Sequence, residues 1–87
     1  MDIVLYSKRN CTFCVQAENL LSIRGFNYKK LMLDEDFARE YLLEQYPNAR
    51  TFPVVTIGGM FIGGYEELYT YLESVKSDGR KFLAEVA

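Results

Sequence analysis

The chain has 87 residues, which suffices for one compact domain, and we expect residues 1–87 to form a single domain. Apolar residues make up 49% of the chain, so a core can form without structural cross-links. Ten basic and twelve acidic side chains give a net charge of −2, which argues against a nucleic-acid partner. The apolar stretch at residues 3–6 is too short for a signal peptide or a membrane span, so we expect a cytoplasmic protein without membrane association.

The first half of the chain predicts a strand, a helix and a second strand. Residues 3–6 form a short, β-prone apolar run typical of a buried central strand. From Phe13 onward, apolar residues recur at helical spacing up to Gly25, which is expected to cap this helix in a left-handed conformation. Residues 26–33 alternate in part between apolar and polar, which predicts the second strand.

A second helix is predicted before Pro47, because proline lacks a backbone N–H and clashes with the preceding helical turn. Asp34 or Asp36 is expected to cap its first turn. The positions that mark this helix are Phe37, Tyr41 and Leu42.

The second half of the chain predicts a hairpin and a further helix. Residues 53–57 and 60–62 are two β-prone segments on either side of Gly58-Gly59, which predicts an antiparallel hairpin. The apolar residues Leu68, Tyr71, Leu72 and Val75 follow the spacing of an amphipathic helix. A short fourth helix is predicted around Phe82, Leu83 and Val86.

These elements predict an α/β fold with the order β-α-β-α-β-β-α plus a short C-terminal helix. The first strand, helix and second strand form a right-handed βαβ unit with parallel strands, and the hairpin adds two antiparallel strands. We therefore expect a four-stranded mixed sheet with helices on both faces. The candidate site lies beyond the carboxyl end of the first strand.

Both cysteines of the chain, Cys11 and Cys14, lie between the first strand and the first helix. Unpaired N–H groups at the start of that helix, together with Lys8 or Arg9, favour a thiolate at Cys11. Cys14, one helical turn later, can displace a group attached to Cys11. With no histidine and only two thiols, the chain lacks the four ligands of a structural zinc site, and no metal is expected.

Three separated motifs resemble those of the glutaredoxins, a family of the thioredoxin-fold superfamily. Cys11-Thr12-Phe13-Cys14 is similar to the family's CPYC, and Thr51-Phe52-Pro53 is similar to its TVP. The segment 63–68, Gly-Gly-Tyr-Glu-Glu-Leu, is similar to its GG-x-acidic-acidic-Leu pattern. The resemblance implies a thioredoxin-like fold and a redox-active disulfide.

The resemblance also implies roles for individual residues in binding glutathione. Cys11 would be the nucleophile and Cys14 the resolving thiol. Lys8 and Arg39 occupy positions where the family holds the glycyl carboxylate of glutathione. Phe13 replaces the family's tyrosine and keeps an apolar wall beside the thiols.

The remaining site residues implied by the resemblance lie in the second and third motifs. Thr51-Phe52-Pro53 is where the superfamily has a cis-proline, and a cis bond exposes the backbone of Phe52 to an extended cysteinyl peptide. Gly63 and Gly64 precede the third helix, whose first N–H groups can receive the γ-glutamyl carboxylate of glutathione, and Gly64 and Tyr65 are implied as binding residues there. Glu66 or Glu67 can meet its ammonium group, and the sequence does not distinguish between them.

The resemblance implies a monomeric, glutathione-dependent thiol–disulfide oxidoreductase that reduces protein disulfides and glutathione mixed disulfides. Ribonucleotide reductase is a plausible acceptor by family analogy. One alternative is an NrdH-type redoxin reduced by thioredoxin reductase, which the segments 9–11 and 24–26 resemble. A second alternative is a dimer holding a [2Fe–2S] cluster with two glutathiones, because Thr12 replaces the rigid proline of CPYC.

Overall fold

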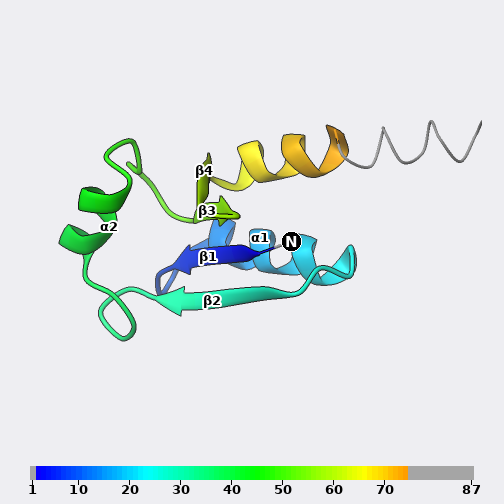
Figure 1. Ribbon diagram of the computed structural model, residues 1–87. Coiled ribbons are helices and arrows are strands. Elements are labelled where there is room, and N and C mark those ends of the chain that lie inside the picture. Colours follow the sequence, from blue (N-terminus) through cyan, green and yellow to red (C-terminus); the bar gives the residue numbers. More distant parts are fainter. Residues whose placement is uncertain (1, 75–87) are drawn as a thin grey trace, which may run out of the picture.

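The computed structural model describes residues 2–74 of the chain (Figure 1). The elements in chain order are β1 (Ile3–Ser7), α1 (Thr12–Ile23), β2 (Tyr28–Met32), α2 (Arg39–Gln45), β3 (Val54–Ile57) and β4 (Met60–Gly63). Residues 65–74 form a further helix. The short helix predicted around Phe82, Leu83 and Val86 lies outside the described residues, as does Val75.

The four strands form one mixed sheet in the order β2-β1-β3-β4. β1 runs parallel to β2 and antiparallel to β3, which pairs antiparallel with β4. The predicted βαβ unit and the hairpin about Gly58-Gly59 are thereby confirmed. In the β1–β3 register Tyr6 faces Val54, so the chain enters β3 next to the carboxyl end of β1, where the cysteines follow.

Alternate residues of β1 point into two separate cores, as the period of a strand requires. Ile3 and Leu5 pack with α1 and with helix 65–74, in a cluster of mainly aliphatic side chains. On the other face, Val4 and Tyr6 pack with α2 in a cluster rich in aromatic rings. The sheet therefore carries helices on both faces, as predicted. Both cores pack against β1, the strand that leads to the cysteines.

The first helix is capped as the sequence predicts, by Gly25 in a left-handed conformation. This residue has a positive φ of 76°, and its N–H donates to the carbonyl of Ser22 at 3.1 Å. The N–H of Phe26 donates to the carbonyl of Leu21 at 2.9 Å, which completes a Schellman motif. Because Phe26 packs against the aliphatic core after this turn, β2 begins later than predicted, at Tyr28.

The predicted cap of the second helix is wrong. α2 begins at Arg39, and the residue before it makes no side-chain capping hydrogen bond. Asp36 instead accepts a hydrogen bond from the N–H of Met32 at 2.8 Å, and Asp34 has a positive φ of 68°. Both aspartates thus belong to a tight turn after β2, and Phe37 precedes the helix rather than forming part of it.

The aromatic core provides a rigid base for the loop that precedes β3. Tyr6 meets Phe37 edge to face, with ring centroids 5.1 Å apart, and Phe37 lies 6.3 Å from Phe52. Burial raises the pKa of Tyr6, and the neighbouring Tyr46 and Tyr41 raise it further. Tyr6 is therefore a neutral phenol at physiological pH and serves a structural role in this cluster.

Candidate active site

The two cysteines form a disulfide at the point where β1 leads into α1. The Cα atoms of Cys11 and Cys14 lie 5.2 Å apart, so the predicted proximity of the two sulfurs is confirmed. Cys11 is the N-cap residue of α1, and its sulfur accepts a hydrogen bond from the N–H of Cys14 at 3.2 Å. Cys14 is buried, whereas Cys11 is partly exposed, so an incoming group can reach Cys11 first.

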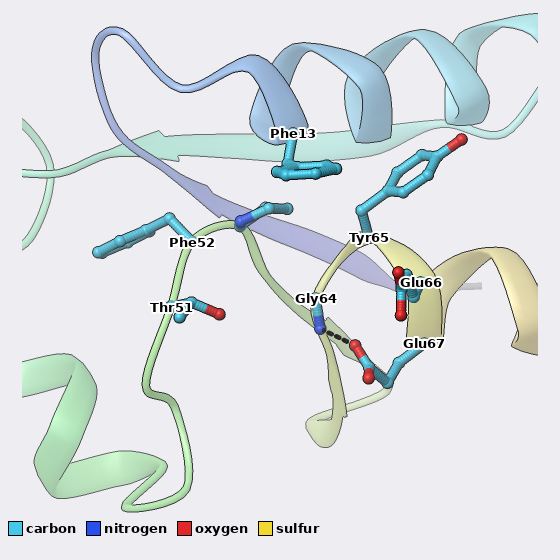
Figure 2. A pocket seen from close by; sticks show the side chains of 8 residues that line it. Phe13, Thr51, Phe52, Gly64, Tyr65, Glu66 and Glu67 are labelled. Atoms are coloured by element: carbon cyan, nitrogen blue, oxygen red, sulfur yellow. Dashed lines mark hydrogen bonds between the residues drawn. The ribbon is translucent and has the colours of Figure 1, made fainter.

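A cavity of about 240 Å³ opens beside this segment (Figure 2). Phe13 contributes one wall from α1, residues 51–53 contribute a second, and residues 64–67 contribute the third. All eight lining residues are ones that the sequence motifs single out, namely Phe13, Thr51, Phe52, Pro53, Gly64, Tyr65, Glu66 and Glu67. The Phe52–Pro53 peptide bond is cis, as expected. The structure thus brings three distant motifs to one cavity.

One end of the cavity is the start of helix 65–74. The N–H of Gly64 donates to Oε1 of Glu67 at 2.8 Å, so Glu67 caps its own helix as the acidic half of a capping box. Gly63 has a φ of 129°, and a Cβ on it would lie 2.8 Å from Cγ of Glu67. Glu66 is exposed and, within residues 2–74, forms no ion pair or side-chain hydrogen bond.

At the other end, two cations lie over the ring of Phe52. Nζ of Lys8 is 5.9 Å from the ring centroid, and Cζ of Arg39 is 5.6 Å from it. Figure 2 shows the Phe52 ring pointing away from Gly64 and the start of helix 65–74. Lys8 and Arg39 do not line this cavity, but both lie over the ring of Phe52, which does.

Comparison with known proteins matches residues 3–62 to the family model described as Glutaredoxin. The chain belongs to the glutaredoxin family. Glutaredoxin 3 of Escherichia coli K12 is 29% identical over 68 residues, which span 78% of this chain and 82% of that protein.

Solved structures of glutaredoxins also resemble the structure of this chain. The crystal structure of a buckwheat glutaredoxin–glutathione complex matches with a TM-score of 0.73 at 29% identity, over 85% of this chain and 70% of that one. The structure of reduced Escherichia coli glutaredoxin matches with a TM-score of 0.72 at 25% identity, over 85% of this chain and 95% of that one. The thioredoxin-like fold expected from the sequence is therefore confirmed.

Family membership and the Cys11–Cys14 disulfide together identify the chain as a thiol–disulfide oxidoreductase. In such enzymes a thiolate attacks one sulfur of a disulfide, and a second thiol resolves the mixed disulfide that forms. In this chain the disulfide joins a partly exposed residue, Cys11, to a buried one, Cys14.

Aromatic rings form the wall above the cavity, and sequence reasoning gave Tyr65 no separate role there. The ring centroids of Phe13 and Tyr65 lie 6.2 Å apart, and Tyr69 continues the row 6.4 Å beyond Tyr65. Phe13 is 56% exposed, so this apolar surface is available to a ligand. The helical step from 65 to 69 places both tyrosines on one side of the helix, a signal that the sequence already contains.

A second cavity, of about 570 Å³, reaches the disulfide from the side of β2 and was not predicted. Both cysteines line it, and so do Glu18 and Lys30, which form an ion pair with a separation of 3.2 Å. Lys30 comes to this cavity because β1 and β2 pair in parallel, with Leu5 opposite Lys30. That register is a tertiary property, which no local pattern in the sequence reveals.

Two further observations concern metals and membranes. Among residues 2–74, no three histidine, cysteine, aspartate or glutamate side chains are grouped so that they could hold a metal ion. In the same part of the chain, none of the helices has the length and apolar character needed to cross a membrane.

Proposed function

We propose that this glutaredoxin uses glutathione as its reductant. The observation that carries the proposal is the contrast between the two ends of the cavity beside the disulfide. Glu66 and a helix N-terminus line one end of the cavity, and Phe52, whose ring lies beneath the charged groups of Lys8 and Arg39, lines the other. Glutathione carries an ammonium and a carboxylate at its γ-glutamyl end, a carboxylate at its glycyl end and a thiol between them. The buckwheat glutaredoxin of similar fold forms a complex with glutathione.

The γ-glutamyl end of glutathione is assigned to the start of helix 65–74. N–H groups in the first turn of a helix attract a carboxylate, and a nearby glutamate can pair with the adjacent ammonium. We assign the ammonium contact to Glu66, because the Glu67 carboxylate already accepts a hydrogen bond from Gly64.

The central part of glutathione is assigned to the segment 51–53 and to the aromatic wall. Extended peptides commonly pair through their backbone with a strand or an extended segment. Phe13 and Tyr65 would cover the peptide from above, since both line the cavity and lie 6.2 Å apart. Phe13 lies between Cys11 and Cys14 in sequence and lines this cavity, so we expect the glutathione sulfur to lie on the Cys11 side of the cavity.

In the dithiol cycle, the Cys11 thiolate attacks a substrate disulfide, a Cys11 mixed disulfide forms, and one substrate sulfur leaves as a thiolate that takes up a proton. Cys14 then loses its proton and attacks the Cys11 sulfur, which releases the second substrate thiol and closes the Cys11–Cys14 disulfide. Two glutathione molecules reduce that disulfide in turn and leave as oxidised glutathione. In the one-thiol cycle, Cys11 accepts glutathione from a modified protein, and a second glutathione removes it.

The start of α1 supports the thiolate that both cycles need. A backbone N–H that donates to sulfur stabilises its anionic form, as does the positive end of a helix dipole. Cys11 has both, because it is the N-cap residue and accepts the N–H of Cys14. We also propose that the protein acts as a cytoplasmic monomer and that ribonucleotide reductase is among the proteins it reduces.

The test is turnover of a small disulfide, bis(2-hydroxyethyl) disulfide, in the presence of NADPH. One arm contains glutathione and glutathione reductase, and the other contains thioredoxin reductase alone. Turnover in the first arm supports the proposal. Turnover in the second arm only would reject it in favour of a redoxin of the NrdH type.

A further inference from the structure

We propose that Phe52 is a positioning residue, whose ring holds Lys8 and Arg39 where they bind the glycyl carboxylate of glutathione. This inference rests on the proposed use of glutathione and adds a reason for the phenylalanine between Thr51 and Pro53. The glutaredoxin motif that this segment resembles has valine there, and an aliphatic side chain offers no aromatic face to a cation.

The ring of Phe52 gathers two cations from parts of the chain that are far apart in sequence. Lys8 follows β1 and Arg39 begins α2, yet both charged groups lie within 6 Å of the same ring centroid. That range is the one over which a cation is attracted to an aromatic face. Two segments that are far apart in sequence therefore converge on one ring.

The two cations have no carboxylate partner among the described residues. The ion pairs within residues 2–74 are Arg9–Glu35, Arg24–Glu73 and Lys30–Glu18. Lys8 and Arg39 are both exposed, and like charges gathered around one ring repel each other. The negative face of the ring offsets part of that repulsion, and an anionic ligand would remove the rest. The arrangement suits a ligand carboxylate.

The ring is held firmly enough to position its neighbours. Phe52 is half-buried and lies next to Pro53, which is buried. On its inner side the ring packs 6.3 Å from Phe37, which meets Tyr6 edge to face in the aromatic core. Lysine and arginine side chains otherwise lose much rotamer freedom when they bind a ligand. A rigid platform that already confines them reduces that loss.

The location of the ring matches the end of the ligand that it would serve. Figure 2 shows the Phe52 ring directed away from Gly64 and Glu66, which line another part of the same cavity. A tripeptide whose γ-glutamyl group lies at the helix start would extend toward Phe52 and place its glycyl carboxylate beside this ring. The charged groups of Lys8 and Arg39 lie over that ring.

The test compares Phe52→Leu, which keeps apolar volume without a π face, with Phe52→Tyr, which keeps the aromatic face. We expect Phe52→Leu to raise the KM for glutathione about three- to tenfold, with kcat at saturating glutathione unchanged. Phe52→Tyr should stay within about twofold of the wild type. Should Phe52→Leu fail to fold, Phe52→Met replaces it, because methionine fills a similar volume flexibly.

A second readout separates positioning from general damage to the fold. Glutathione whose glycyl carboxylate is converted to an amide has the same thiol but lacks the terminal charge. The wild type and Phe52→Tyr should prefer glutathione to this amide, and Phe52→Leu should lose most of that preference. Equal preference in all three proteins would overturn the inference while leaving the use of glutathione intact. Failure of the wild type to turn over with glutathione would instead reject the proposed function.

Discussion

The two ends of the cavity beside the disulfide differ in whether their charged side chains already have a polar partner within the protein. At the helix end, the protein satisfies part of the site by itself, because the carboxylate of Glu67 accepts the N–H of Gly64. At the other end, Lys8 and Arg39 lie over the ring of Phe52, and neither forms an ion pair within residues 2–74. The comparison teaches that a charge used inside the protein contributes to stability, whereas a charge left without a partner is available for a ligand.

The largest effect is expected between the two ends, at Cys11. Cys11→Ser should reduce turnover of disulfide substrates by at least about 1,000-fold, because a serine hydroxyl is not ionised at neutral pH and cannot replace the thiolate. The matched control is Cys14→Ser, which should still remove glutathione from a glutathionylated peptide. Turnover is measured in the NADPH-coupled assay. Retained activity in Cys11→Ser would show that Cys11 is not the nucleophile and that the cavity does not bind glutathione for attack at this sulfur.

The next effect concerns the backbone at Gly63, directly before the start of helix 65–74. Gly63→Ala should lower the free energy of unfolding by about 2–3 kcal/mol, because Gly63 has a φ of 129° and a Cβ there would collide with Glu67. Gly59→Ala is the control, since its φ is 81° but nothing lies within 4 Å of the added atom. It should cost only about 1 kcal/mol in urea denaturation. Equal losses in the two variants would mean that the contact with Glu67 is unimportant.

A smaller pair of effects separates the two glutamates. Glu67→Ala should lower the free energy of unfolding by about 1 kcal/mol, because the helix loses its capping contact. Glu66→Ala should leave stability within about 0.5 kcal/mol but raise the KM for glutathione roughly tenfold, because it removes a charged contact to the ligand. Thermal unfolding and steady-state kinetics measure both quantities. The reverse pattern would transfer the ligand contact to Glu67.

The smallest effect is expected from one cation at the Phe52 end. Arg39→Met should raise the KM for glutathione about two- to fivefold at low ionic strength, and the difference should shrink in 1 M salt because exposed charges are screened. Arg50→Met, an exposed arginine close to Thr51 in sequence, is the matched control and should not change KM. An equal change in both variants would indicate a general loss of positive charge rather than a site at Phe52.

Local patterns in the sequence predicted most of the fold. The Gly58-Gly59 turn, the Gly25 cap and the helix containing Leu68 all depend on residues close in sequence, and each is present in the structure. The predicted caps at Asp34 and Asp36 were wrong, because these side chains serve a turn after β2. A short acidic residue before a helix is compatible with either role, so the sequence alone does not decide between them.

The sequence predicted which residues form the candidate site, but it did not predict the contacts that these residues make with one another. Three motifs named every residue that lines the cavity, since family resemblance transfers such positions directly. The glutamate pair remained undecided in the sequence, although Glu67 three residues after Gly64 matches half of a capping box. The convergence of Lys8 and Arg39 on Phe52 was not predictable, because it depends on how β1, α2 and the loop before β3 pack together.

The most direct test of the central claim is a crystal structure of Cys14→Ser with glutathione disulfide-bonded to Cys11. We predict that the tripeptide occupies the cavity lined by Phe13, residues 51–53 and residues 64–67, with its ammonium group at Glu66 and its glycyl carboxylate between Lys8 and Arg39. A tripeptide that extends instead into the cavity on the β2 side, beside Glu18 and Lys30, would contradict the assignment of both ends.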